Sequence, residues 1–109
     1  MLFTTISPKA KSVIQTDMFT TEIIECDQLS VLLNPYGAGA QKIECEVILG
    51  NMISIDNVLQ FNKVFSIFTS LTAKDISTWG QDDSTLLDIV ASKLGAATSG
   101  YSTVEWGSF

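Results

Sequence analysis

The side chains of this chain that could carry chemistry are few, and their spacing matches no catalytic or metal-binding pattern. Asp82, Asp83 and Asp88 form the one carboxylate cluster of the sequence, but the D-x-[DN]-x-[DN]-G order of a calcium loop is absent. Because an apolar stripe follows, we interpret Asp82 or Asp83 as a helix cap and Asp88 as part of a solvated helix face. No metal site is predicted.

The sequence also lacks the residue pattern that nucleophilic catalysis needs. Ser and Thr fill 23 positions, yet the chain has no His to activate a hydroxyl, and no Ser-x-x-Lys begins a predicted helix. Gly37-Ala38-Gly39 lacks the third Gly and the Lys of a phosphate-binding loop and is interpreted as part of a hairpin loop. We therefore expect neither a cofactor nor enzymatic activity. A small enzyme with a pocket of carboxylates or Lys is the least favoured hypothesis.

Charge limits the class of partner. The net charge is -6, with six Lys, no Arg and twelve carboxylates, which repels a phosphate backbone and offers no guanidinium for guanine or phosphate. Direct nucleic-acid binding is not expected. The sequence has no apolar stretch of about 20 residues and no signal-peptide pattern. We expect no membrane contact and synthesis in the cytoplasm.

Cys26 and Cys45 are the two cysteines. They lie in separate predicted strands, form no C-x-x-C motif and have no His beside them, so a zinc site is not indicated. Two small reduced core residues are the favoured interpretation, and a cross-strand disulfide is the alternative.

Three successive strands are the clearest elements that the sequence predicts. Apolar and polar residues alternate over 28–33, 42–49 and 52–60, as in strands of an antiparallel sheet with one wet face. The segment 34–40 has the composition of a loop, and Gly50-Asn51 that of a two-residue turn. Together they predict an antiparallel meander.

The segment 61–72 fits a helical stripe, but its three Phe with Val and Ile favour a strand buried on both faces, at the centre of the core. A helix is predicted at about 83–94, ended by Gly95 in a left-handed conformation. Trp79, just before it, is expected to pack back on this helix. Alternation from residue 101 predicts a last strand that reaches nearly to Phe109.

The predicted fold class is mainly β, an antiparallel sheet or small β-sandwich with one α-helix. A length of 109 residues indicates a single domain, 1–109. Ser7-Pro8 interrupts regular structure, so residues 1–12 are interpreted as an N-terminal arm. Val13-Ile14 and Phe19 fit either a first short strand or a projecting segment that orders only against a neighbour.

Partner binding is expected at the chain ends and on one strand face. The tail 104–109 either closes the domain's own sheet or docks on another subunit, because termini fray unless they are tied down. Glu44 and Glu46 share a strand face and form an acidic stripe, for which an ordinary solvated face is the alternative. The candidate partner-binding residues are Phe3, Ile6, Trp106, Phe109, Glu44 and Glu46.

A stretch near the C-terminal third carries a family resemblance. Trp79-Gly80-Gln81-Asp82-Asp83-Ser84, followed by Ile89-Val90-Ala91-Ser92-Lys93-Leu94-Gly95, resembles small virion structural proteins of tailed bacteriophages. In these proteins a strand runs into a W-G-x-D-D-S turn and a short helix that ends in K-L-G. The likeness covers about 20 residues. It implies assembly into a particle and assigns no catalytic residue.

The hypothesis that follows is a non-enzymatic structural subunit of a phage virion. It would bind capsid, neck or tail proteins and further copies of itself, with a decoration or cement role on the capsid slightly favoured over a head-tail connector or tail component. The alternative is a free acidic adaptor or inhibitor that places its acidic sheet face on a basic surface.

Overall fold

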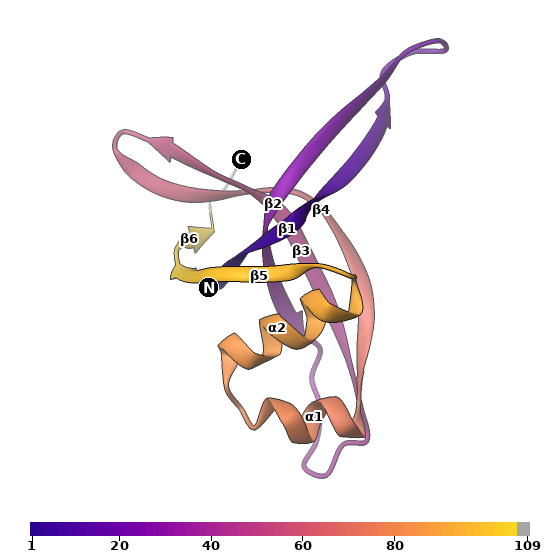
Figure 1. Ribbon diagram of the computed structural model, residues 1–109, viewed down its shortest axis with the longest axis vertical. Helices are drawn as coiled ribbons and strands as arrows, with labels where there is room; N and C mark the ends of the chain where they lie inside the picture. Colours follow the sequence, from indigo (N-terminus) through magenta and orange to yellow (C-terminus); the bar gives the residue numbers. More distant parts are fainter. Residues whose placement is uncertain (107–109) are drawn as a thin grey trace.

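The computed structural model describes residues 1–106 (Figure 1). Six strands form one curled sheet, and two helices pack against it. The strands are β1 (Leu2–Gln15), β2 (Thr21–Leu33), β3 (Lys42–Ile55), β4 (Val58–Thr72), β5 (Ala97–Thr103) and β6 (Glu105–Trp106). The helices are α1 (Ala73–Trp79) and α2 (Asp83–Lys93). The prediction of a mainly β, antiparallel fold is confirmed, but within these residues there are two helices where one was predicted.

The sheet has the strand order β5-β1-β2-β3-β4-β6. Every neighbouring pair is antiparallel except β4 and β6, which are parallel. The two edge strands, β5 and β6, are consecutive in sequence and separated only by Val104. The Val104 backbone N–H donates to the Met1 carbonyl oxygen at 3.1 Å. The chain thus passes from one edge of the sheet to the other beside its own N-terminus.

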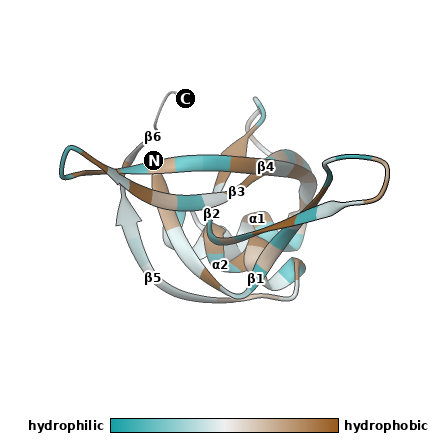
Figure 2. Ribbon diagram, turned by 90° about the horizontal axis from the view of Figure 1, so that it is seen from above, coloured by the Kyte–Doolittle hydropathy of each residue, from teal (hydrophilic) through white to brown (hydrophobic). Residues whose placement is uncertain are grey.

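The main core lies between the helices and the sheet, which curls around them (Figure 2). α1 packs against β3 and β4, and α2 packs against β1, β2 and β5. Alternate strand residues face the helices, as the period of two requires. The buried residues of this core are Ile6, Cys26, Leu29, Ile43, Cys45, Val47, Leu49, Leu71, Trp79, Leu86, Leu87, Val90 and Ala91.

Cys26 and Cys45 are both buried and free, as the favoured interpretation predicted. Burial raises the pKa of both thiols, which keeps them protonated and inert as small apolar groups. Both cysteines therefore belong to the packing of the helix-facing core.

A second, smaller core contains Phe3, Ile48, Phe61 and Val104. Ile48 lies between Val47 and Leu49 along β3 and therefore points to the opposite face from the helices. The rings of Phe3 and Phe61 stack with their centroids 4.3 Å apart. This contact links β1 to β4 across the two strands between them and fixes the curl of the sheet at this end.

The antiparallel meander of β2, β3 and β4 is confirmed, but the strand predicted at 52–60 is wrong, because this segment holds the end of β3, a turn and the start of β4. β3 continues through Gly50-Asn51 to Ile55, with a bulge in its pairing to β4 at Leu49/Gly50. The turn lies at Asp56-Asn57, where φ is 52° and 64°. Positive φ at both central residues is what a type I′ turn requires, and Asp and Asn tolerate it.

The strand predicted at 61–72 exists as part of β4, but it is not buried on both faces. Most of its residues are only partly covered, and Phe68 is 74% exposed. α1 packs against β4, and among the described residues the stretch 62–70 is partly covered or exposed throughout. The aromatic content that suggested a central strand therefore reflects β-propensity more than burial.

α1 was not predicted, and it explains the position of Trp79. Trp79 is the last residue of α1 rather than a loop residue, and it is buried in the main core together with the buried residues of α2, as predicted for its packing. The Trp79 ring also meets Tyr36 edge to face at 6.3 Å between centroids. The indole anchors α1 and the 34–41 loop to the same core.

α2 agrees with its prediction almost to the residue. Its N-cap is Asp82, whose side chain accepts a hydrogen bond from the Ser84 N–H, and Gly95 follows the helix with φ of 82°. The last strand predicted from residue 101 is instead divided into β5 and β6 by Val104. The segment beyond Trp106, with Phe109, lies outside the described residues.

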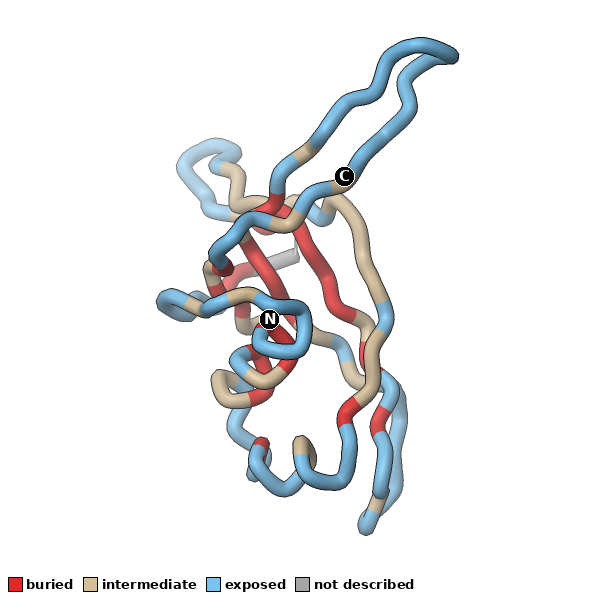
Figure 3. The backbone as a smooth tube through the Cα atoms, turned by 45° about the vertical axis from the view of Figure 1, so that its right-hand side comes forward, coloured by how far each residue is buried: buried red, intermediate tan, exposed pale blue. Residues whose placement is uncertain are grey.

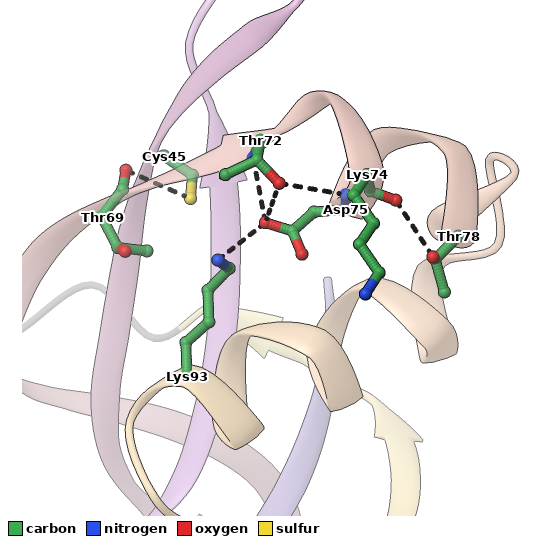
Figure 4. A network of polar contacts seen from close by, with 7 residues as sticks. All are labelled: Cys45, Thr69, Thr72, Lys74, Asp75, Thr78 and Lys93. Atoms are coloured by element: carbon green, nitrogen blue, oxygen red, sulfur yellow. Dashed lines mark hydrogen bonds and ion pairs between the residues drawn. The ribbon is translucent and has the colours of Figure 1, made fainter.

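A polar network joins the start of α1 to the end of α2 (Figure 4). The Asp75 carboxylate accepts from the Thr72 N–H at 2.9 Å, while the Asp75 N–H donates to the Thr72 hydroxyl at 3.3 Å. This is a reciprocal capping box. Lys93 Nζ lies 2.7 Å from Asp75 Oδ2. The Lys93 ammonium, and then the Thr72 N–H, hold the pKa of Asp75 below its ordinary value.

Replacing Asp75 with Ala is expected to lower the free energy of unfolding by about 1 kcal/mol at neutral pH, because the cap and the ion pair are lost together. Since the folded-state pKa is depressed, the carboxylate contributes fully above its ordinary pKa of 3.8. That contribution is lost as the pH falls through the lower folded value. Urea unfolding of both proteins should show the difference shrinking in acid.

The matched control is Lys74→Ala, because the Lys74 ammonium takes part in no ion pair among the described residues. This variant should match the wild type within about 0.5 kcal/mol. If the loss in free energy of unfolding of the Asp75→Ala variant grew as the pH was lowered, this account of the network would be contradicted.

Candidate interaction surface

Two of the candidate partner-binding residues are interior residues. Residues 2–15 form β1, so the interpretation of 1–12 as an arm is corrected. Phe3 has no exposed surface and Ile6 has 5%. Phe3 stacks on Phe61, and Ile6 packs in the helix-facing core. Both side chains are therefore almost wholly covered by the chain's own structure.

Glu44 and Glu46 do share the face of β3 that points away from the helices, but each carboxylate has a Lys beside it. Lys42 Nζ lies 3.1 Å from Glu44, and Lys63 Nζ lies 3.7 Å from Glu46. The two residues therefore make no continuous negative stripe. The ordinary solvated face, held open in the sequence analysis, fits this geometry.

The C-terminal tail joins the chain's own sheet as far as it is described. Glu105 and Trp106 pair through their backbones with Gln60 and Phe61 of β4. The tail was expected either to close the domain's own sheet or to dock on another subunit. For Glu105 and Trp106, the pairing corresponds to the first alternative. Phe109 lies outside the described residues.

The most exposed apolar surface lies on a projection of β1 and β2, residues 10–26, which we call the ribbon. Six cross-strand pairs, from Ala10↔Cys26 to Gln15↔Thr21, build it. The pairing of β1 with β2 is interrupted between Thr5 and Ala10, where β1 leaves the body. The ribbon extends away from the helices (Figure 1) and is exposed along nearly its whole length (Figure 3).

Beyond the base of the ribbon, where Ala10 and Cys26 pack in the main core, apolar side chains stand on both faces with no core beneath them. Val13 and Ile23 form a direct cross-strand pair and are 65% and 58% exposed. Ile14 and Ile24 lie on the opposite face by alternation. A lone two-stranded hairpin is marginally stable in water, and contiguous exposed apolar residues mark interaction sites. Val13 and Ile14 belong to a strand, as one of the two alternatives predicted, and this strand projects from the body with Phe19 in the turn after it. That a neighbouring molecule orders this segment stays a prediction.

The end of the ribbon, residues 16–20, which we call the tip, has a defined shape. Asp17 Oδ1 accepts hydrogen bonds from the Phe19 N–H at 2.7 Å and the Thr20 N–H at 2.9 Å. The hydrogen bond from the Phe19 N–H is the main cause that lowers the pKa of Asp17, and the hydrogen bonds from Thr20 add to it. The turn thus holds Met18 and Phe19 outward, 78% and 90% exposed.

The far end of the β3–β4 hairpin is a second projection (Figure 1). Ile55 and Val58 pair directly beside the Asp56-Asn57 turn, and both are exposed, as is Leu59. The radius of gyration is 15.1 Å, larger than the value of about 13 Å expected for a compact chain of this length. Two hairpins therefore extend from the body, and both end in apolar side chains.

The carboxylates that could have done chemistry serve the fold. The Asp82 carboxylate accepts from the Ser84 N–H and hydroxyl, and the Ser84 hydroxyl is the main cause of its lowered pKa. Asp88 accepts from the Thr98 and Tyr101 hydroxyls, and its hydrogen bond raises the pKa of Tyr101. Within the described part of the chain, no three Cys, Asp or Glu gather where they could hold a metal ion.

Comparisons of this chain with protein-family models, with curated proteins and with solved structures found no match. No helix within residues 1–106 has the length and apolar character to cross a membrane. The geometry of the exposed hairpins is therefore the main guide to function.

Proposed function

We propose that this protein is a non-enzymatic structural subunit of a phage virion. It binds neighbouring capsid, neck or tail proteins and further copies of itself, and it requires no cofactor. The resemblance of Trp79–Ser84 and Ile89–Gly95 to small virion proteins supports the class of particle. The engagement of Asp82 and Asp88 in helix capping and hydroxyl binding supports a structural role over a chemical one.

The observation that carries the proposal is the exposed apolar ribbon. Val13, Ile23, Met18 and Phe19 contribute nothing to either core, although exposing them to water is unfavourable. A partner that covers the ribbon gains their burial and orders a hairpin that is weakly held on its own. Repeated contacts of this kind make individually weak interfaces durable in a symmetric particle.

A decoration protein on the capsid and a head-tail connector or tail component use the ribbon in the same way and differ in the neighbour it contacts. We keep the decoration role as the favoured one because the chain is short and acidic. The alternative of a free acidic adaptor depends on Glu44 and Glu46. It has less support, because a Lys lies beside each of these carboxylates.

The test combines solution mass with particle composition. Sedimentation velocity over a concentration series should show wild-type protein passing from monomer to larger species, and mass spectrometry should detect the chain in purified virions. A protein that stays monomeric at every concentration and is absent from virions would overturn the proposal.

A further inference from the structure

A pocket at the base of the ribbon, which we call the basal pocket, has features that fit the tip. It has a volume of about 250 Å³ and lies between β1, β4 and the end of α2. Its apolar lining includes Ile6, Leu49, Phe65, Ile67 and Leu94. Lys9 and Lys11, both exposed, also line it. Neither Lys takes part in an ion pair within the described residues. The basal pocket therefore offers an apolar wall and two ammonium groups that form no described ion pair, with Glu25 opposite Lys11 across the β1–β2 pair.

The tip carries the matching groups. Phe19 and Met18 are the two most exposed large apolar side chains described, and aromatic anchors that enter pockets dominate many interfaces. Asp17 supplies a negative charge next to them. No Lys lies in the segment 16–20. The tip is thus an apolar knob with one carboxylate, held in shape by the hydrogen bonds to Asp17 Oδ1.

The tip and the basal pocket of one molecule lie at opposite ends of the ribbon. Strands rise about 3.3 Å per residue, so the six steps from Ala10 to Thr16 place the tip roughly 20 Å from the base. The paired strands keep the ribbon extended. The occupant of the basal pocket must therefore come from a different molecule.

We propose that the tip of one copy docks into the basal pocket of a second copy, with Phe19 and Met18 against the apolar wall and Asp17 facing Lys9 and Lys11. This inference rests on the proposed function and names the partner as the chain itself. Because each copy has one tip and one pocket, two copies can exchange tips in a two-fold dimer. The contact can also repeat head-to-tail to give a larger ring or an open filament, according to the rotation between copies. The net charge of -6 repels copies elsewhere, so the local opposite charges also orient the encounter.

The experiment is a complementation test with two variants. The tip variant carries Met18→Ser and Phe19→Ser, and the pocket variant carries Lys9→Glu and Lys11→Glu. All four positions are exposed, so the tip variant should keep the wild-type thermal transition. In the pocket variant the Lys11→Glu change faces Glu25, and its thermal transition should fall by a few degrees at most. Each variant alone should associate at least about tenfold more weakly than the wild type. An equimolar mixture should form dimers, because the intact tip of the pocket variant meets the intact pocket of the tip variant.

A control variant carries Lys42→Glu and Lys74→Glu, which changes the net charge by the same amount away from the basal pocket. It should assemble like the wild type, which separates local charge matching from general repulsion. Native mass spectrometry and sedimentation velocity give the populations of monomer, dimer and larger species. An Asp17→Asn variant keeps an acceptor oxygen for the turn and should weaken assembly by removing only the charge.

Three results would overturn the docking inference: a mixture that stays monomeric, a pocket variant that assembles like the wild type, or a wild type that does not self-associate. The proposed function is tested separately, by which of the proteins enter virions. If the wild type enters virions and the tip variant does not, while the pocket variant still does, the ribbon binds a different virion protein. The structural role then stands and the docking of copies is wrong.

Discussion

Replacing Met18 and Phe19 with Ser is expected to weaken assembly by roughly 100-fold or more while leaving the folded monomer unchanged. Burial of a large apolar side chain contributes about 1.5–3 kcal/mol, so losing two such anchors removes at least about 3 kcal/mol of interface free energy. Both side chains are exposed in the monomer. Their loss should alter the free energy of unfolding by no more than about 0.5 kcal/mol.

The matched control is Phe68→Ser. Phe68 is 74% exposed and belongs to β4, away from the ribbon. This variant removes an equivalent aromatic surface and should assemble like the wild type. Sedimentation equilibrium gives the association constants, and thermal unfolding monitored by circular dichroism gives the stability. Equal losses of assembly in both variants would show that general apolar exposure, and not the tip, drives association.

Replacing Gly50 with Ala is expected to destabilise the fold by about 3 kcal/mol, at the upper end of the range for overpacked sites. A Cβ at Gly50 would lie 2.0 Å from the Asn62 carbonyl oxygen and 2.8 Å from Phe61 Cζ. Because the nearer atom is backbone, the strain is relieved only by separating β3 from β4 at the bulge. The same movement disturbs the stack of Phe61 on Phe3.

Gly37→Ala is the control for this prediction, because a Cβ there meets nothing within 4 Å. Guanidinium unfolding should place Gly37→Ala within about 0.5 kcal/mol of the wild type. For Gly50→Ala, the melting temperature should fall by roughly 10–20 °C. A Gly50 variant as stable as the wild type would mean that β3 and β4 lie farther apart than the structure places them.

Gly50 also shows where sequence reasoning met its limit. A Gly-Asn pair between alternating segments has the composition of a turn, and nothing in the local sequence distinguishes it from a glycine required by a close approach of strands. The deciding atoms, Asn62 and Phe61, belong to another strand. The true turn at Asp56-Asn57 has residues that tolerate positive φ, but its signal is weaker than that of Gly50-Asn51.

Elements with local signals were predicted well. α2 has an acidic cap at Asp82, an apolar stripe and Gly95 after its last turn, and each of these acts within a few residues. α1 had a comparable signal in Thr72 and Asp75, which are spaced as a capping box. It was missed because the strand predicted at 61–72 ends where α1 begins, and the seven residues of α1 are too few to show a clear apolar stripe.

For the ribbon, the sequence left a strand and a projecting segment as alternatives, and the structure shows a strand that projects. Burial on one face imposes alternation on a strand, but the ribbon covers no core, so its apolar residues follow no clear period. Phe3 and Ile6 were assigned to an interface for a related reason, since their pairing with distant strands could not be inferred from their neighbours in sequence. The fold class follows from local pattern, whereas the interaction surface depends on which apolar residues tertiary packing leaves uncovered.

Hydrogen exchange of the ribbon amides, followed by mass spectrometry in the dissociated and the assembled protein, tests the central claim most directly. In the monomer, amides between residues 11 and 25 should exchange fast, because the ribbon is exposed and weakly held. Assembly should slow their exchange markedly and leave peptides from α1 unchanged. Ribbon exchange that is equally fast in both states, in a sample shown to be assembled, would contradict the account.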